Sequence, residues 1–453
     1  MTIVAKFGGS SLANAERIKN VAGIIRKIKK ESDVVVVVSA IGDTTNFLIK
    51  TAREPTFVDN AINNLYSRHM TILEQIKKPS GKDKSVLKSF CDCIEKRLLI
   101  VQEKKVQLQE DIDYISGFGE KFSAFILSCA IEEMDLNAKI FHGDDNLIFT
   151  NENFGDGAVL FSRTNTVLKK VILPALKDNA VIFSGFVGTA LNGKTTTLGR
   201  GSSDYVASII GAALDAEEIR IYTDVDGIMT ADPRIVKNAR VIRKIDFNEI
   251  SELAYFGAYV LHPKTIKPAM EKNICVKVIN SFNTDSFTEI LNNSPKTDAP
   301  IKAISSKRNI SIINIRSLKM LNSSGFIARV FGAFKRENIS VDMISTSEVN
   351  ISLSVDEQND FDCRIERAIC NLTKFSSVET RKGKTLICVI GEGMRHRYGI
   401  LGKIFTIIGN NKINVEMVSQ GASEINITFV VDDIDADRAV NALHEELING
   451  EIK

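Results

Sequence analysis

The sequence has no apolar stretch long enough to cross a bilayer and almost no net charge. Its longest uncharged apolar run, near residues 34–42, falls well short of the roughly 20 residues that a membrane helix needs. The opening MTIVAKFGG holds too short an apolar segment for a signal peptide. With 58 basic and 56 acidic residues the formal charge is +2, which disfavours a nucleic-acid-binding surface or an acidic tail. We therefore expect a cytoplasmic protein that acts on small molecules, without nucleic-acid or membrane partners.

Residues typical of metal sites and disulfides are also sparse. Seven cysteines are scattered over 453 residues without a C-x-x-C pair, a distribution that suits reduced thiols in a cytosolic protein. The histidines show no metal-ligand spacing. We expect them on the surface or as core filling, and they are His69, His142, His262, His396 and His444. The sequence thus predicts no disulfide, no zinc site and no other metal site built from protein side chains.

What the sequence does contain is an alternation of strand and helix patterns. Residues 2–7 and 33–39 have the composition of buried strands, and a helical pattern from about 12 to 30 separates them. Further strands are predicted at 139–142, 180–186, 218–224 and 275–280, each beside a helical stretch. The alternation predicts an α/β fold with an open, mainly parallel sheet covered by helices.

The chain also shows signs of division into domains. Strand signals vanish over about 57–111, where helical spacing indicates an insertion in a first domain spanning residues 1–293. Residues 294–309 include the linker-like NSPKTDAP. A strand-helix-strand-strand-helix order then appears twice, over 310–384 and 385–453. We predict two small modules of the ferredoxin-like βαββαβ type.

The first informative motif is KFGGSS, where the first strand meets the first helix. Open α/β sheets bind ligands at this edge. Gly8 and Gly9 allow backbone N–H groups to approach a phosphate, and Lys6 offers a charge to neutralise it. A tight turn with an exposed lysine explains the same residues, so this motif alone decides nothing.

The second motif is TTTLGRGSSD, residues 195–204, which leads into an apolar helix. Ser203 or Asp204 could simply cap that helix. Capping gives no reason for the Gly-Arg-Gly sequence, in which Arg200 presents a guanidinium fork beside exposed backbone amides. The motif therefore favours binding of an anionic group.

Just before it, GTALNGKT (188–195) formally satisfies the G-x-x-x-x-G-K-[ST] pattern of a phosphate loop. Such a loop must continue into a helix, yet three β-branched threonines and Gly-Arg-Gly follow here. Asn192-Gly193 is a hairpin signal. We predict a β-hairpin.

The third motif, TDVDGIMTADPR (223–234), begins where another strand ends. It has the turn formers of an ordinary loop. Its three aspartates and one arginine nevertheless stand at the carboxyl edge of the sheet, where a nucleotide would bind.

Together with SGFGE (116–120) and FGAYVLHP (256–263), these motifs resemble the aspartate kinases of the amino-acid-kinase family. Residues 320–348 resemble the first ACT regulatory module of the monofunctional, lysine-sensitive members. The resemblance covers essentially the whole chain. It implies the amino-acid-kinase fold followed by two ACT modules, and ATP-dependent phosphorylation of L-aspartate to 4-phospho-L-aspartate. That reaction is the entry step to lysine, threonine and methionine biosynthesis, with feedback inhibition by lysine.

The resemblance also implies roles for individual residues. The catalytic pair is Lys6 and Asp204. The aspartate-binding positions are Ser39, Thr45, Glu120, Arg200, Gly201, Ser202 and Ser203. The ATP-binding positions are Lys6, Phe7, Gly8, Gly9, Thr223, Asp224, Met229, Arg234, Tyr259 and Val260. The lysine-site positions are Met320, Ser323, Phe326, Ile327, Ser340, Val341, Asp342, Ser347 and Glu348.

Some positions depart from the family pattern. Tyr259 stands where many members have a lysine near the nucleotide, and Met229 where a tyrosine is common beside the adenine. Ser202 replaces a more usual glycine, and SGFGE replaces a shorter serine-glycine-glutamate arrangement. Nucleotide affinity is therefore the property most open to change.

The chemistry explains why no histidine dyad is needed. An aspartate side chain, with a pKa of about 3.9, is already ionised at neutral pH and needs no general base. In-line positioning and charge neutralisation fall to Lys6, the glycine amides and Mg²⁺ held by phosphate oxygens and water. Glu120 and Arg200 offer opposite charges for the ammonium and α-carboxylate of the substrate.

For the C-terminal modules we expect an effector site and a homodimer interface, with a dimer of dimers as the larger alternative. Asp342 and Glu348 suit an ammonium group, so lysine is the first expected effector and threonine the second. Two other hypotheses are another family member acting on glutamate, carbamate or a nucleotide, and a catalytically weak amino-acid sensor. TTTLGRGSSD and the paired modules argue against the first, and retention of Lys6, Glu120, Arg200 and Asp204 against the second.

Overall fold

The computed structural model describes residues 1–104, 106–199, 201–257, 261–292, 300–320, 324–357, 361–421 and 424–449. The chain forms two compact units. The first comprises residues 1–228, 243–247 and 261–294, and the second residues 229–242, 248–260 and 295–453. Across the described ranges, no helix has both the length and the apolar character needed to cross a membrane.

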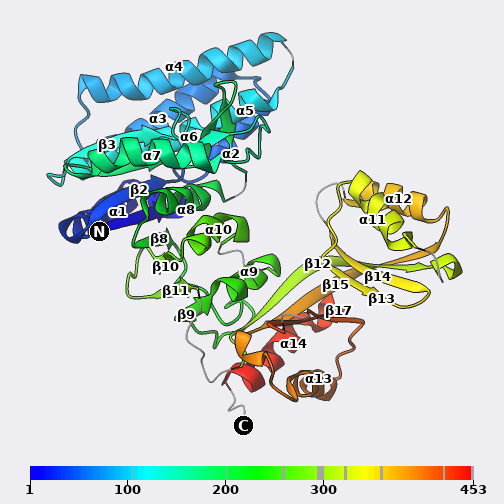
Figure 1. Ribbon diagram of the computed structural model, residues 1–453. Coiled ribbons are helices and arrows are strands. Elements are labelled where there is room, and N and C mark those ends of the chain that lie inside the picture. Colours follow the sequence, from blue (N-terminus) through cyan, green and yellow to red (C-terminus); the bar gives the residue numbers. More distant parts are fainter. Residues whose placement is uncertain are drawn as a thin grey trace. The chain divides into compact units, whose positions relative to one another are not determined.

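The first unit is built on an eight-stranded sheet (Figure 1). In spatial order its strands are β3 (Ala138–His142), β5 (Ala180–Ser184), β2 (Asp33–Val38), β1 (Thr2–Phe7), β8 (Glu218–Thr223), β10 (Cys275–Asn280), β11 (Phe287–Leu291) and β9 (Lys244–Asp246). Neighbours are parallel except β10 and β11. The predicted open, mainly parallel sheet is confirmed.

Helices cover both faces of this sheet, which explains why residues 34–38 are all fully buried. Ile3 and Ala5 share a core with α1 (Ala15–Glu31) and α6 (Phe118–Glu132). Val4 points the other way, towards Gly211 of α8 (Ser202–Leu214). On that side α7 (Phe161–Leu176) packs beside α8. A short 3₁₀ turn, Ser10–Leu12, joins β1 to α1, and α10 (Pro263–Glu271) packs on α8.

The expected helical insertion consists of helices that carry a core of their own (Figure 1). They are α2 (Thr44–Arg53), α3 (Val58–Ile76), α4 (Gly81–Lys104) and α5 (Gln109–Ser116). His69 on α3 is fully buried and stacks on Phe122 of α6, with ring centroids 4.3 Å apart. Burial lowers the pKa of His69 to about 4, so this ring is neutral core filling.

The first unit also contains a small three-stranded sheet. In spatial order its strands are β4 (Phe149–Thr150), β6 (Val187–Ala190) and β7 (Thr195–Thr197). Strands β6 and β7 pair antiparallel, and Gly193 has φ +82° in the turn between them. The hairpin predicted for residues 188–195 is confirmed, and the phosphate-loop pattern there is accidental.

The second unit is built on a six-stranded antiparallel sheet. Its order is β13 (Met343–Thr346), β14 (Asn350–Asp356), β12 (Ala303–Arg316), β15 (Ser377–Ile390), β17 (Asn426–Asp432) and β16 (Met417–Gln420). The helices are α9 (Phe247–Tyr255, in this unit from Asn248 on), α11 (Phe326–Arg336), α12 (Phe361–Leu372), α13 (Ile400–Asn410) and α14 (Asp433–His444). Short 3₁₀ turns span Leu318–Met320 and Glu392–Met394, and a π-helical turn spans Glu445–Asn449.

The first module of this unit is inserted into the second instead of preceding it along the chain. Residues 310–316 of β12 pair with β14 and with residues 377–384 of β15. Residues 303–307 pair with residues 386–390 of β15, and Ile304 lies in the core that includes α13 and α14. The first half of β12 therefore completes the second module. The linker expected to reach residue 309 gives way to a strand at Ala303, because a distant partner strand covers this polar-looking segment.

Candidate active site

The turn after β1 places an ammonium group beside two glycines. Lys6 Nζ lies 2.6 Å from Asp204 Oδ1, and the two side chains are 12% and 14% exposed. A Cβ on Gly8 would lie 3.7 Å from Lys6 Nζ, and one on Gly9 would meet the Ala40 carbonyl oxygen at 2.8 Å. Only glycine fits at Gly9, so the backbone there approaches the turn after β2 closely. This is the geometry of a phosphate-binding turn with a cation at its mouth.

The Phe7 side chain does not face that turn. Its ring is fully buried and stacks on Tyr222 of β8, with centroids 4.5 Å apart. Phe7 instead accepts a hydrogen bond through its carbonyl from Ser39 N at 3.1 Å. The sequence places Phe7 at the nucleotide, and in the structure it contributes to the core and to the β1–β2 contact.

Glu120 at the start of α6 is a buried carboxylate with an unused oxygen. It is 3% exposed, and its Oε1 accepts a hydrogen bond from Ala40 N at 3.1 Å. Its Oε2 is buried and has no hydrogen-bond partner. Burial raises the pKa of Glu120 to about 8, against the smaller opposing effect of the Ala40 N–H. A buried acid held this way is suited to receive a cationic group.

Glycine also explains how α6 reaches the turn after β2. A Cβ on Gly119 would lie 2.8 Å from Ala40 Cβ and 3.5 Å from Thr45 Oγ1. Thr45, the second residue of α2, is half-buried, as is Ser39 at the end of β2. Ser39 and Thr45 flank the turn after β2, and Glu120 comes from a distant part of the chain. All three thus lie around Ala40 and Gly119.

The start of α8 supplies the remaining polar residues. Gly201 is its N-cap residue with φ +71°, and Ser202 donates to the Gly199 carbonyl. Ser203 is packed against Gly185, where a Cβ would lie 2.7 Å from Ser203 Oγ. Gly185 N in turn donates to Val38 O at 3.0 Å, next to Ser39. Capping by Ser203 or Asp204, the ordinary alternative, is absent here, since no side chain caps this described helix start.

Thr223 ends β8 at the same carboxyl edge, and Asp224, which follows it, is exposed. Gly8 N donates to Tyr222 O at 3.3 Å, which joins this strand end to the glycine turn. Of the other predicted nucleotide residues, Met229 and Arg234 belong to the second unit, where Arg234 Nη2 lies 2.6 Å from Asp232 Oδ2. Tyr259 and Val260 lie outside the described residues, as does Arg200, which is predicted to bind aspartate.

Sequence reasoning missed the residue that anchors the threonine run before Gly199. Asp113 of α5 is fully buried and accepts hydrogen bonds from Thr197 N (2.9 Å), Thr197 Oγ1 (3.1 Å) and Gly155 N (2.7 Å). Gln109 adds a fourth at 2.9 Å. An acid beside Ile112 on the buried stripe of a helix is the local signal that pointed to it.

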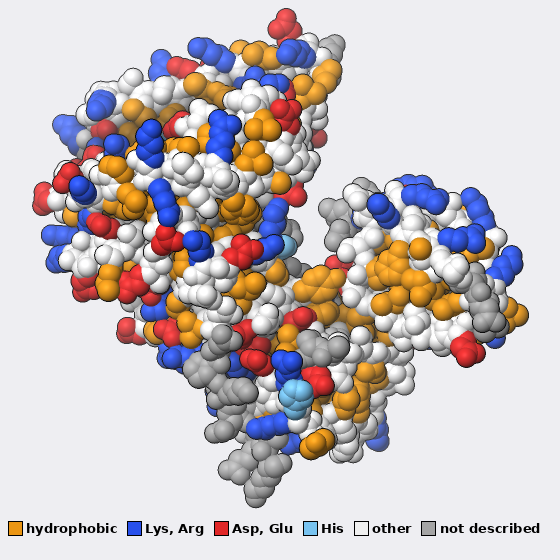
Figure 2. All heavy atoms as spheres, in the orientation of Figure 1, with side chains coloured by type: hydrophobic (Ala, Val, Ile, Leu, Met, Phe, Trp, Pro, Cys, Tyr) orange, Lys and Arg blue, Asp and Glu red, His pale blue; other side chains and the backbone are white. Residues whose placement is uncertain are grey.

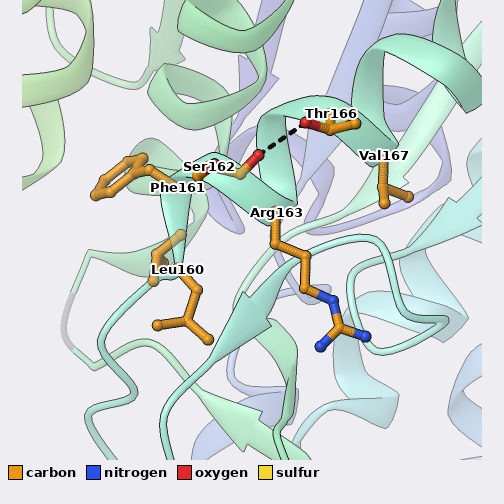
Figure 3. A pocket seen from close by; sticks show the side chains of 7 residues that line it. Leu160, Phe161, Ser162, Arg163, Thr166 and Val167 are labelled. Atoms are coloured by element: carbon orange, nitrogen blue, oxygen red, sulfur yellow. Dashed lines mark hydrogen bonds between the residues drawn. The ribbon is translucent and has the colours of Figure 1, made fainter.

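A hollow of about 630 Å³ opens at the start of α7, away from these residues (Figure 3). It is lined by Val159, Leu160, Phe161, Ser162, Arg163, Thr166 and Val167. The Arg163 guanidinium lies 3.8 Å from the centre of the Phe149 ring. None of the predicted catalytic or substrate residues contributes to its lining, so we do not associate it with the site.

The predicted effector positions lie in the second unit. Phe326 is buried at the start of α11, Ile327 is exposed, and Met320 is half-buried. Ser340, Val341 and Asp342 precede β13, whereas Ser347 and Glu348 are exposed between β13 and β14. Ser323 lies outside the described residues. Hydrophobic side chains gather on the surface near α11 (Figure 2), where Ile327 and Phe331 are each more than a third exposed.

Comparison with known proteins agrees with this arrangement. Residues 1–280 match the amino acid kinase family, and residues 313–361 and 387–447 match the ACT domain. The chain is 36% identical to aspartokinase 1, chloroplastic, of Arabidopsis thaliana, over 98% of this chain and 80% of that protein. It is 32% identical to lysine-sensitive aspartokinase 3 of Escherichia coli, over 98% and 99%.

Solved structures extend the likeness to the fold. Escherichia coli aspartokinase III in complex with aspartate and ADP has a TM-score of 0.84 at 32% identity, covering 99% of this chain and 100% of that one. The same enzyme in complex with lysine and aspartate has a TM-score of 0.83 at 32% identity, covering 99% of each chain. The chain belongs to the amino acid kinase family and, within it, to the aspartokinases that carry C-terminal ACT domains.

Proposed function

We propose that the protein transfers the γ-phosphoryl group of ATP to the side-chain carboxylate of L-aspartate, giving 4-phospho-L-aspartate and ADP. This reaction would open the route to lysine, threonine and methionine. The observation that carries the proposal is the Lys6–Asp204 pair beside the Gly8–Gly9 turn, together with the buried Glu120, whose Oε2 has no hydrogen-bond partner. The relatives that bind aspartate and ADP support it.

Lys6 is the group that neutralises charge as the phosphoryl group moves. The backbone at Gly8 and Gly9 is open to phosphate oxygens, and Lys6 Nζ lies over Gly8. Asp204 holds the ammonium in place at 2.6 Å and keeps the long side chain from spreading over several rotamers. A cation fixed before the reaction costs no reorganisation during it.

Mg²⁺ fits this site as a companion of ATP. Within the described ranges no cluster of three or more His, Cys, Asp or Glu side chains could hold a metal on its own. Mg²⁺ is commonly held by one or two carboxylates together with phosphate oxygens and water, and Asp204, 2.6 Å from Lys6 Nζ, is a carboxylate that could serve beside the glycine turn. When bound, the ion screens the phosphate charges.

Aspartate recognition rests on the two opposite charges that its α-carbon carries. Glu120 Oε2 has no hydrogen-bond partner and could accept a hydrogen bond from the substrate ammonium. The positive charge of that ammonium would also favour the ionised form of Glu120, whose pKa is raised. Arg200 is assigned the α-carboxylate through its bidentate fork. Ser39, Thr45, Ser202 and Ser203 would complete the pocket with neutral donors. An aspartate held by its ammonium and its α-carboxylate presents its side-chain carboxylate in line with the phosphate.

Regulation by lysine is the second part of the proposal, with threonine as the alternative effector. One relative is named lysine-sensitive, and one solved structure of that enzyme contains lysine. Asp342 is the acid we assign to the effector ammonium. The exposed apolar side chains near α11, Ile327 and Phe331, support a homodimer that pairs ACT modules, or a dimer of such dimers.

The test is ADP release from Mg-ATP with L-aspartate, with L-glutamate as the control substrate and with lysine or threonine added. We expect aspartate-dependent turnover that lysine suppresses. Equal turnover with glutamate would contradict the substrate assignment. No turnover together with measurable lysine binding would instead indicate an amino-acid sensor.

A further inference from the structure

The acid assigned to the effector is already occupied. The Asp342 side chain is 4% exposed, Lys307 Nζ lies 3.1 Å from its Oδ2, and the Tyr255 hydroxyl donates to its Oδ1 at 2.9 Å. Lys307 also lies 2.7 Å from Asp356 and 5.4 Å from the centre of the Tyr255 ring. Burial, and then the charge of Asp342, raise the pKa of the Tyr255 phenol, so this hydroxyl is a donor at neutral pH. Both partners of Asp342 therefore come from within the chain.

The second module contains a similar arrangement without a tyrosine among its described contacts. Lys384 lies 2.5 Å from Glu416, which precedes β16, and 2.5 Å from Asp432, which ends β17. Asp342 precedes β13 and Asp356 ends β14 in the same way. An internal lysine between two acids is thus a repeated feature, and the bond from Tyr255 distinguishes the first module.

Tyr255 belongs to a segment that is pressed onto the first half of β12. Ser305 Oγ donates to Phe256 O at 2.5 Å. Gly257 has φ +110°, and a Cβ there would meet Ser306 O at 2.7 Å. In the sequence, Ala258 separates residues 255–257 from Tyr259 and Val260, the positions that the resemblance assigns to ATP. The bond to Asp342 therefore holds a segment that lies next in the sequence to two positions assigned to ATP.

An incoming ammonium group cannot simply be added to this arrangement. Asp342 is enclosed, and a second ammonium beside Lys307 would be repelled by it in a poorly hydrated site. A ligand shifts an equilibrium only when it binds one arrangement better than the other. An effector that needs Asp342 thus favours the arrangement in which Tyr255 and Lys307 have left it.

We propose that Tyr255 and Lys307 compete with the effector ammonium for Asp342, and that their displacement releases residues 255–257 from β12. The inference rests on the proposed regulation by lysine or threonine. It makes the phenol-carboxylate bond a contact of the effector-free arrangement alone. Removing that bond should therefore strengthen effector binding instead of weakening it.

The test compares the full-length wild type with Tyr255→Phe, which removes one hydroxyl and keeps the ring. Tyr398→Phe, at a fully exposed tyrosine of the second module, is the matched control. L-Lysine and L-threonine are titrated into each protein by calorimetry, and inhibition of ADP release is measured in parallel. Because a hydrogen bond to a charged group is lost, we expect Tyr255→Phe to bind the effector about five- to tenfold more tightly. The control should match the wild type.

Unchanged or weaker effector binding by Tyr255→Phe, with the wild type bound and inhibited normally, overturns the competition while leaving the proposed function intact. Binding of neither amino acid to the wild type overturns the proposed regulation together with the competition. Hydrogen exchange of the wild type serves if the variant does not fold. Faster exchange at the amides of residues 255–257 on adding the effector is expected, and equal or slower exchange overturns the release.

Discussion

Two buried acids of this protein are assigned to ammonium groups, and the chain treats them differently. In the first unit, Glu120 accepts one hydrogen bond from a backbone N–H, and its other oxygen is buried without a hydrogen-bond partner. Asp342 in the second unit has an internal ammonium and a phenol. A substrate pocket needs only to be ready for its ligand, whereas a switch must stabilise its acid in each of two states. The internal partner is what distinguishes the second role from the first.

The largest effect should come from removing Lys6, the cation of the Lys6–Asp204 ion pair that is assigned to catalysis. Lys6→Met leaves the phosphate without its fixed cation, and we expect kcat to fall by about 10²- to 10³-fold, as for other lost charge-stabilising groups. Steady-state kinetics with saturating ATP and aspartate measures this. The exposed Lys19→Met on α1 is the control. A fall below threefold would remove Lys6 from the mechanism.

Next in size is the effect of a change that prevents the residue at position 120 from ionising. Glu120→Gln keeps the shape but loses the charge opposite the substrate ammonium, so the aspartate KM should rise roughly 30- to 100-fold. The ATP KM should stay within twofold. Glu132→Gln, an exposed glutamate on the same helix, should leave both constants unchanged. An equal rise in the two KM values would mean that Glu120 shapes the whole site without selecting aspartate.

A smaller effect is expected at the α-carboxylate of the substrate. Arg200→Lys keeps the charge and loses the bidentate fork, so the aspartate KM should rise roughly tenfold, far more than the ATP KM. The measurement is a pair of substrate titrations at fixed co-substrate. Equal effects on both substrates would sink the assignment of Arg200 to the α-carboxylate.

The last test measures stability, not kinetics, and uses pH. Because the pKa of Glu120 is raised to about 8 in the folded protein, its ionisation there opposes folding, and stability falls as pH rises from about 4.5 to 8. The loss is at most about 1.4 kcal/mol per pH unit. Thermal melting at pH 5, 6.5 and 8 should show Glu120→Gln gaining on the wild type across this range. L-Aspartate should close the gap, and a pH-independent difference would contradict the raised pKa.

Much of the first unit could be predicted because its signals are local. Buried strands, glycine turns and the Asn192–Gly193 hairpin are each encoded within a few residues, and the structure confirms them. The contacts that join distant residues could not be predicted. Asp113 meets Thr197 across 84 positions, and Lys307 meets Asp342 across 35. Periodicity reports which face of an element is buried, but not which partner it finds there.

The same limit explains the strand boundary at Ala303. Residues 303–309, AISSKRN, look polar, yet Ile304 is fully buried in the core of the second module. The resemblance assigns Phe7 to the nucleotide without saying where its ring points, and the ring is part of the core for a related reason. A motif fixes the path of the backbone, while neighbouring strands decide where each side chain points.

The insertion of the first module into the second has a consequence for how this part of the chain folds. Residues 303–307 remain without their sheet partner until residues 386–390 have been synthesised, so the second module closes a loop of about 80 residues. Such non-local pairing folds slowly and leaves strand edges uncovered in the meantime. The second module cannot be cut out as one continuous piece, and a chain interrupted between α12 and β15 would present β12 as an open template for aggregation.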